Sequence, residues 1–389
     1  MAAPPSGVAP APGPLIGRAA EVPAASGPRR GRLLALDGLR LVAALMVCLY
    51  HYTGRGGTVS ASWHTHPARL FPVLSRAAVY GNLGVQFFFV ISGFVICMSS
   101  WGRTLGDFFR SRVARLYPAY WVALVLVTAA SLALPAVVRP VRLDEFLVNL
   151  TMLQQPMGAT RVLGVCWTLW AEVRFYVLFA LLVVLRGVTY RRVVLFAAVW
   201  TTAAVLCRSS GDELLNQVVM PDYAPFFVGG LALYLIHRFG GDPLAWGIVA
   251  MSWLLAQSEA TRGLWGPHPH RDPYVVILVV TAAFAAVAAV ALDWTRRASW
   301  PWLATAGALT YPFYLVHEHL GWFVIRVLHR GLGLPSWPTL AVTVAGMLLL
   351  AWLIHRFVER PLGPRLKRAL KERKSGGRSP RRGCSSAGS

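Results

Sequence analysis

The chain has 389 residues, of which 56% are hydrophobic and 14% charged, and its mean hydropathy is +0.53. This balance excludes an ordinary soluble domain, and repeated apolar runs of about 20 residues indicate a multi-pass membrane protein. The formal charge of +22 lies in the tails and short loops, so it does not indicate nucleic-acid binding.

Residues 1–32 and 362–389 are rich in Arg and in small or turn-forming residues, and we predict disordered basic tails there. The membrane domain is therefore expected at 33–361. Five scattered cysteines without a C-x-x-C pair support neither a disulfide framework nor a zinc site. No metal is expected.

Hydrophobic runs predict about ten transmembrane helices and an all-α fold. A weaker amphipathic segment at 145–153 is expected at the membrane surface. An even number of spans places both termini on one side, and the Lys and Arg of the tails favour the cytoplasmic side of the inner membrane. The predicted spans are 34–53, 80–100, 117–135, 167–185, 193–207, 223–237, 244–258, 274–292, 302–320 and 338–356.

The first span, LLALDGLRLVAALMVCLYHYTG, contains Arg40 and His51. At about 100° and about 1.5 Å per residue, eleven positions return to nearly the same helix face and advance roughly 16 Å. The two side chains should therefore line one face without contacting each other. Ionisable residues within a membrane helix usually have a function. The structural alternative is an arginine paired with Asp37 and an interfacial histidine.

The second span and the loop after it carry a small-residue motif and then a cluster of arginines. In GNLGVQFFFVISGFVI, Ser92 and Gly93 permit the close approach of another helix or of a ligand. Arg112 and Arg115 follow in the loop, three residues apart, so they share a face if the loop is helical. Such a pair either binds phosphate or only sets the membrane topology.

The fourth and ninth spans carry further polar groups. In CWTLWAEVRFYVLFALLVV, Glu172 lies in an apolar run near the outer end, where His51 is also expected. Its partner should come from another helix. In LTYPFYLVHEHLGWFV, three residues recur at three-residue spacing: Tyr311, Tyr314 and His317.

These segments resemble the acyltransferase-3 family of integral-membrane O-acyltransferases over nearly all of residues 33–361. The resemblance implies a standalone member without the fused hydrolase-like domain of many relatives. One departure is His319, which stands where Pro often follows the family histidine. The motifs are Arg40 with His51; FF-x-x-SGF including Ser92; R-x-x-R and YP from Arg112 to Pro118; W-x-L-x-x-E from Trp167 to Glu172; PFF-x-x-G from Pro225; and Y-x-x-Y-L-x-H from Tyr311 to His317.

Members of that family move an acyl group from acyl-CoA, taken from the cytoplasmic side, to a hydroxyl of a sugar or similar acceptor. The resemblance thus implies acyl-CoA as a co-substrate and no permanently bound cofactor. We expect His51 to be the base, because imidazole exchanges a proton near neutral pH, and Glu172 to orient or stabilise it.

The remaining motif residues are expected to bind or support the substrates. Arg112 and Arg115 would hold the phosphates of coenzyme A, and Arg40 would contact the donor on its way to His51. Acceptor-binding or supporting roles are expected for Ser92, Trp167, Tyr311, Tyr314 and His317.

Two other classes of function use the same buried charges. A transporter or flippase would use them as a substrate or proton pathway, and a structural partner of a polymer-synthesis machine would carry an inert site. Within the enzyme hypothesis, we expect transfer of an acetyl or other short acyl group. The acceptor is either a cell-envelope glycan or a small secondary metabolite.

Overall fold

The computed structural model describes residues 33–262 and 271–375, and every regular element in these ranges is a helix. The predicted all-α class is therefore confirmed. The first half contains α1 Leu34–Leu49, α2 Thr58–Trp63, α3 Pro67–Leu70, α4 Pro72–Ala78, α5 Gly84–Ser100, α6 Leu105–Ala133, α7 Leu143–Asn149 and α8 Cys166–Leu182. The second half contains α9 Tyr190–Arg208, α10 Glu213–Val219, α11 Ala224–Phe239, α12 Pro243–Arg262, α13 Pro273–Ala291, α14 Pro301–Ile325, α15 Ser336–Ile354 and α16 Arg360–Ser375.

Within the described ranges, eight helical stretches are long and apolar enough to cross a membrane, and they coincide with eight of the predicted spans. The helices α12 and α14 lie at the other two predicted positions. Polar residues lower the hydropathy of α14 where the sequence reads His317, Glu318, His319. The protein is a multi-pass membrane protein, and the count of ten spans remains a prediction.

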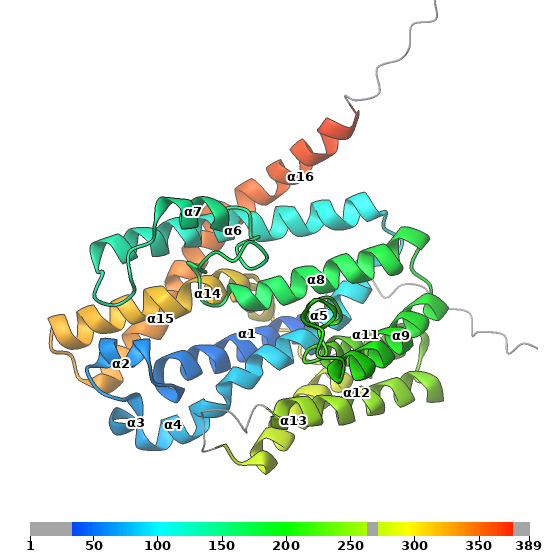
Figure 1. Ribbon diagram of the computed structural model, residues 1–389, viewed down its shortest axis with the longest axis horizontal. Coiled ribbons are helices and arrows are strands. Elements are labelled where there is room, and N and C mark those ends of the chain that lie inside the picture. Colours follow the sequence, from blue (N-terminus) through cyan, green and yellow to red (C-terminus); the bar gives the residue numbers. More distant parts are fainter. Residues whose placement is uncertain (1–32, 263–270, 376–389) are drawn as a thin grey trace, which may run out of the picture.

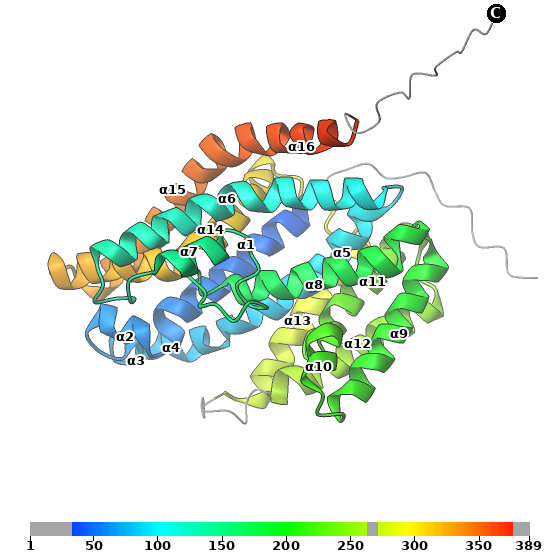
Figure 2. The ribbon, with the colours of Figure 1, turned by 45° about the horizontal axis from the view of Figure 1, so that its top comes forward.

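The helices α1 and α5 lie near the middle of the bundle in both ribbon views (Figures 1 and 2). Helix α5 packs against α1, α11 and α13, and α14 packs against α1, α6 and α15. The helices α9 to α13 form one flank, whereas α16 projects from the opposite edge (Figure 2). The first and ninth predicted spans are thus neighbours in space.

Two glycines allow α5 and α11 to come close. A Cβ at Gly93 would overlap the carbonyl oxygen of Phe227, and a Cβ at Gly230 would overlap that of Val90. Small residues at such crossings let helix backbones approach and gain van der Waals contact. The SGF and PFF motifs therefore meet as one packing unit, which positions α5 against the rest of the bundle.

Residues 360–375 form α16, although a disordered tail was predicted from residue 362. Leu362, Leu366 and Leu370 recur every four residues among strong helix formers, a pattern that favours a helix with one apolar stripe. The helix also has a packing partner in the tertiary structure, because α16 lies against α6. The predicted tails at 1–32 and 376–389 lie outside the described residues.

Candidate active site

His51 and Glu318 form a close pair where the end of α1 meets α14. His51 Nδ1 lies 3.0 Å from Glu318 Oε1, and the two side chains are only 12% and 7% exposed. The contact between these two atoms does not have the geometry of an aligned hydrogen bond. Hydrogen bonds between catalytic residues are often poorly aligned in the absence of substrate and tighten when it binds. Arg55 Nη1 lies 3.7 Å from the same carboxylate oxygen. The carboxylate is thus shared by an imidazole and a guanidinium.

A π-helical turn, Tyr50–Gly54, continues α1 and carries His51. Its backbone is tied to α14 from both directions. Trp322 Nε1 donates to the His51 carbonyl at 3.1 Å, and the Tyr52 hydroxyl donates to the His317 carbonyl at 2.6 Å. Such π-helical turns occur frequently at functional sites, and here the turn holds the imidazole against α14.

His317 lies next to His51 but is more deeply buried. Its ring centroid is 5.3 Å from that of His51, and the side chain is fully buried. The Nδ1 atom donates to the Tyr314 carbonyl at 2.9 Å, which leaves Nε2 as the acceptor of the neutral ring. Within the described residues Nε2 has no hydrogen-bond partner.

Glu172 does not supply the carboxylate beside His51, contrary to the pairing expected from the sequence. Its Oε1 accepts from the Ser92 hydroxyl at 2.8 Å, and its Oε2 accepts from the Tyr176 hydroxyl at 2.9 Å. Both partners and Glu172 line a cavity with Arg40 and Arg112. The reason is helix packing: α14, which carries Glu318, packs along α1, whereas α8, which carries Glu172, packs against α5.

A cavity of about 680 Å³, which we call the wide cavity, opens between α1, α6, α14 and α16. Arg40, Arg115 and Tyr311 belong to its lining. This volume is in the range of known ligand and cofactor sites, roughly 300–1,000 Å³. The start of α1 and the start of α16 both line it, so the two ends of the membrane domain lie on one side of the bundle.

Two smaller cavities extend from the wide cavity. The first, the narrow cavity, is lined by Arg40 and Tyr311 together with Ser92, Arg112, Arg115, Glu172 and Tyr176. The second, the aromatic cavity, shares Arg40, Phe88, Glu172 and Tyr311 with the narrow cavity and adds Phe89, Thr168 and Tyr314. The Tyr314 ring lies 5.5 Å from that of His317, centroid to centroid. The shared lining residues join the three cavities into what we call the passage, and Tyr314 of its lining packs against His317; neither His317 nor His51 lines these three cavities.

The two predicted arginines both line the narrow cavity but differ in burial. Arg112 is buried, with Nη2 donating to the Ser99 hydroxyl at 2.5 Å and its guanidinium over the Tyr176 ring. Arg115 is exposed and lines both the wide and the narrow cavity. The two arginines therefore face different depths of the same passage, which suits an extended ligand better than a single phosphate held by both.

Three other predicted site residues have clear partners. The Tyr311 hydroxyl donates to the Leu116 carbonyl at 2.9 Å, and the Tyr314 hydroxyl lies 3.0 Å from that of Thr168. Trp167 packs near Tyr223, with ring centroids 5.9 Å apart. The tyrosines thus join α14 to α6 and α8 along the passage, while Trp167 lies beside it.

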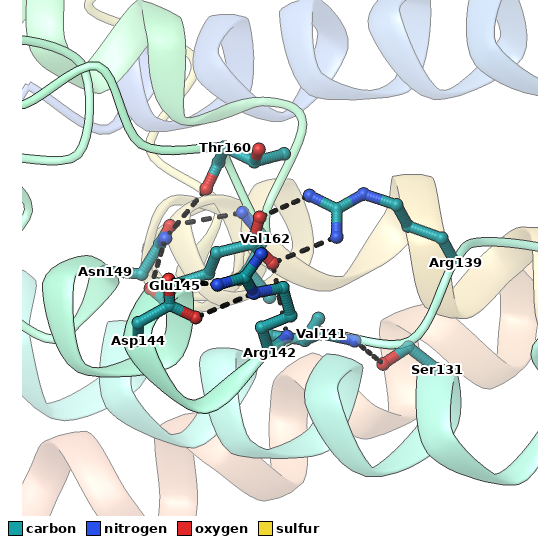
Figure 3. A network of polar contacts seen from close by, with 9 residues as sticks. All are labelled: Ser131, Arg139, Val141, Arg142, Asp144, Glu145, Asn149, Thr160 and Val162. Carbon is teal, nitrogen blue, oxygen red and sulfur yellow. Dashed lines mark hydrogen bonds and ion pairs between the residues drawn. The ribbon is translucent and has the colours of Figure 1, made fainter.

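Figure 3 shows a polar network that involves the end of α6 and the segment between α6 and α8. Asn149 is fully buried; its Nδ2 donates to the Thr160 carbonyl at 2.9 Å, and its Oδ1 accepts from the Val162 amide at 3.1 Å. The Val162 carbonyl accepts from His319 Nδ1 at 2.8 Å. A Cβ at Gly164 would overlap the Glu318 carboxylate, so residues 162–164 lie directly against it.

The start of this segment is held by an ion pair outside the membrane spans. Arg139 donates to both carboxylate oxygens of Glu145, one of them at 3.0 Å. This contact lowers the pKa of Glu145 to about 2 from its ordinary 4.5. Glu145 belongs to α7, the surface helix predicted at 145–153, which the structure confirms in shorter form.

Replacing Asn149 by alanine is expected to destabilise the protein by about 1–3 kcal/mol, because the buried Val162 amide loses its acceptor. Residues 160–164 should then exchange amide hydrogens faster than in the wild type. Thermal unfolding in detergent and hydrogen exchange measure the two effects. Asp144→Ala is the control on the same helix, since Asp144 only forms an exposed ion pair with Arg142. Equal stability of the two variants would contradict the proposed support.

Sequence reasoning missed Glu318 and Arg55. Glu318 stands between two histidines inside a predicted span, and a carboxylate in that position is costly unless it is paired. That cost was the available signal. Arg55 lies just beyond the first span, and its location gives no such signal because an arginine there commonly anchors a helix.

Comparison with known proteins identifies the family to which this chain belongs. A family model described as an acyltransferase domain matches residues 33–356. The acyltransferase MdmB of Streptomyces mycarofaciens is 27% identical over 379 residues, which cover 86% of this chain and 92% of that protein. The exopolysaccharide production protein ExoZ of Rhizobium meliloti (strain 1021) is 28% identical over 312 residues, covering 72% of this chain and 89% of ExoZ.

No solved structure matches this chain. The family match spans the membrane domain, from the start of α1 to the end of α15, and includes all the cavity-lining residues that the sequence motifs predicted. This chain belongs to the acyltransferase-3 family of membrane acyltransferases.

Proposed function

We propose that this protein transfers an acetyl or other short acyl group from acyl-CoA to a hydroxyl of a sugar or related acceptor. One observation carries the proposal: a wide cavity with cationic lining shares Tyr311 of α14 with the aromatic cavity, whose Tyr314 packs against His317 beside the His51–Glu318 pair. A donor with a phosphorylated end and a long flexible arm fits such a passage. The thioester would then reach His51 while the phosphates stay near Arg115.

In the proposed reaction, His51 Nε2 takes the proton of the acceptor hydroxyl while Nδ1 faces Glu318. The acceptor oxygen attacks the thioester carbonyl carbon and forms the ester bond. The carbon–sulfur bond breaks, and the departing thiolate of coenzyme A receives the proton from the imidazolium. Glu318 acts as a positioning residue that stabilises the charged ring.

His51 suits the role of base better than His317. Its side chain is partly exposed and paired with a carboxylate, whereas His317 is fully buried. Arg55, with 34% of its side chain exposed, retains guanidinium donors for the acceptor or the developing oxyanion. His317 Nε2 would accept a hydrogen bond from a bound substrate group.

The proposed class of acceptor is based on the names of two relatives. ExoZ is named for exopolysaccharide production, and MdmB is named an acyltransferase. A sugar hydroxyl on a glycan or on a smaller metabolite is consistent with both names. We place the protein in the cytoplasmic membrane with the wide cavity facing the cytoplasm, because acyl-CoA is made there and basic segments concentrate on that side.

The test uses the full-length protein purified in detergent, with acetyl-, propionyl- and butyryl-CoA as donors and a panel of methyl glycosides as acceptors. We expect the glycoside to stimulate release of free coenzyme A and to gain one acyl group, which mass spectrometry detects. A transporter would require a sealed membrane, so turnover in detergent separates the two classes. Failure of all three donors to bind or react would contradict the acyl-CoA assignment.

A further inference from the structure

The wide cavity is completed by a helix that lies beyond the family match. The match ends at residue 356, whereas Gly363, Pro364 and Lys367 of α16 line the cavity. Helix α16 packs along α6, the helix that carries Arg115. At Gly363 the helices come close, since a Cβ there would lie 3.4 Å from the Ala114 carbonyl oxygen. One turn later, Lys367 lies on the same face of α16.

The lining of the wide cavity contains more cationic than anionic side chains. Its cationic lining residues are Arg40, Arg115 and Lys367, and its carboxylates are Asp37 and Glu359. Glu359 already accepts from His355 Nδ1 at 2.8 Å. Within residues 33–262 and 271–375, neither Arg115 nor Lys367 forms an ion pair. Two cations that form no direct ion pair with the described residues, one from α6 and one from α16, thus border the cavity.

We infer that α16 is part of the donor site and that Lys367, together with Arg115, binds phosphate at the nucleotide end of coenzyme A. The inference rests on the proposed acyl-CoA donor and adds a binding residue outside the matched family region. Lysine and arginine suit phosphate groups as cationic hydrogen-bond donors. The helix also supplies a wall to the cavity, so the donor is enclosed by residues on both sides of its phosphates.

Anionic lipid headgroups also carry phosphate, and α16 has other basic residues exposed beside Lys367, including Arg365 and Arg368. These two do not line the wide cavity. Arg368 is therefore a matched control: it is adjacent to Lys367, exposed and on the same helix, but points to a different surface.

The experiment measures binding of coenzyme A and of 3′-dephospho-coenzyme A by isothermal titration calorimetry in a neutral detergent without lipid. We expect Lys367→Ala to raise the Kd for coenzyme A about five- to tenfold and Arg368→Ala to change it less than twofold. Lys367→Arg, which keeps the charge, should restore binding. If Lys367 contacts the 3′-phosphate, the alanine variant should also lose the preference of the wild type for coenzyme A over its dephospho form.

Equal Kd values for Lys367→Ala, Arg368→Ala and the wild type would overturn the inference while leaving the proposed donor intact. Absence of binding by the wild type would overturn the proposed donor together with the inference. A parallel measurement uses nanodiscs with and without phosphatidylglycerol. If Lys367→Ala reduced only the retention of phosphatidylglycerol, with an unchanged Kd for coenzyme A, Lys367 would be a lipid contact and the inference would be wrong.

Discussion

Replacing His51 by glutamine is expected to lower kcat for acyl transfer about 10²- to 10⁴-fold, the usual contribution of a general base. Glutamine keeps a polar side chain of similar reach, so the contacts that hold the turn, Trp322 to the His51 carbonyl and Tyr52 to the His317 carbonyl, should persist. The Kd for coenzyme A should change little, because the proposed phosphate contacts are at Arg115, away from His51. Coenzyme A release and calorimetric donor binding measure the two quantities.

His64→Asn is the control for this variant. His64 is exposed and adopts a left-handed backbone conformation, with φ of 63°, that asparagine tolerates. It should retain wild-type activity. A folded His51→Gln protein that binds donor and keeps full turnover would show that the base lies elsewhere, and His317 would then be the next residue to replace.

Replacing Glu318 by glutamine is expected to reduce kcat about 10²- to 10³-fold, since the imidazolium formed in the reaction loses its negative partner. The substitution preserves the shape that residues 162–164 pack against. The carboxylate acts only through His51 in the proposed mechanism. The double variant should therefore be no slower than His51→Gln alone, because residues that act as a unit are not additive.

Glu259→Gln on α12 serves as a matched control, because Glu259 is also buried and bonded to an arginine, Arg208, but lines none of the three cavities. This variant should affect unfolding and leave kcat unchanged. If Glu318→Gln lost activity only in proportion to its lost stability, or if the double variant lost the product of the two single effects, the proposed pairing would be refuted.

The order of apolar and ionisable residues along individual helices predicted several residues of the site. The lengths of the hydrophobic runs predicted the all-α membrane fold. The positions of Arg40 and His51 predicted ionisable side chains at two different levels of the first transmembrane helix. The structure places Arg40 in the three cavities and His51 beside α14. Motif spacing likewise singled out Tyr311, Tyr314 and His317; the two tyrosines line the passage, and His317 packs against Tyr314.

The partner of each buried charge could not be predicted in this way. Glu172 and Glu318 are both carboxylates in apolar runs, and the sequence favoured the wrong one as the neighbour of His51. The depth and rotation of α8 and α14 relative to α1 decide the pairing. Those quantities depend on packing, including the bonds from Tyr52 to α14 and from Trp322 to the turn after α1, rather than on the period of any single helix.

The sequence by itself therefore determined an α-helical membrane fold with ionisable groups inside its spans, because hydrophobicity is a local property of the chain, and its motifs carried the resemblance to the acyltransferase-3 family that the family match confirms. Only the tertiary structure decided that Glu318 lies beside His51, that Glu172 bonds to Ser92 and Tyr176, and that α16 lines the wide cavity. The physical reason is that a buried charge must be compensated by whatever group the folded bundle brings to it, and the groups that meet here come from helices far apart in the chain.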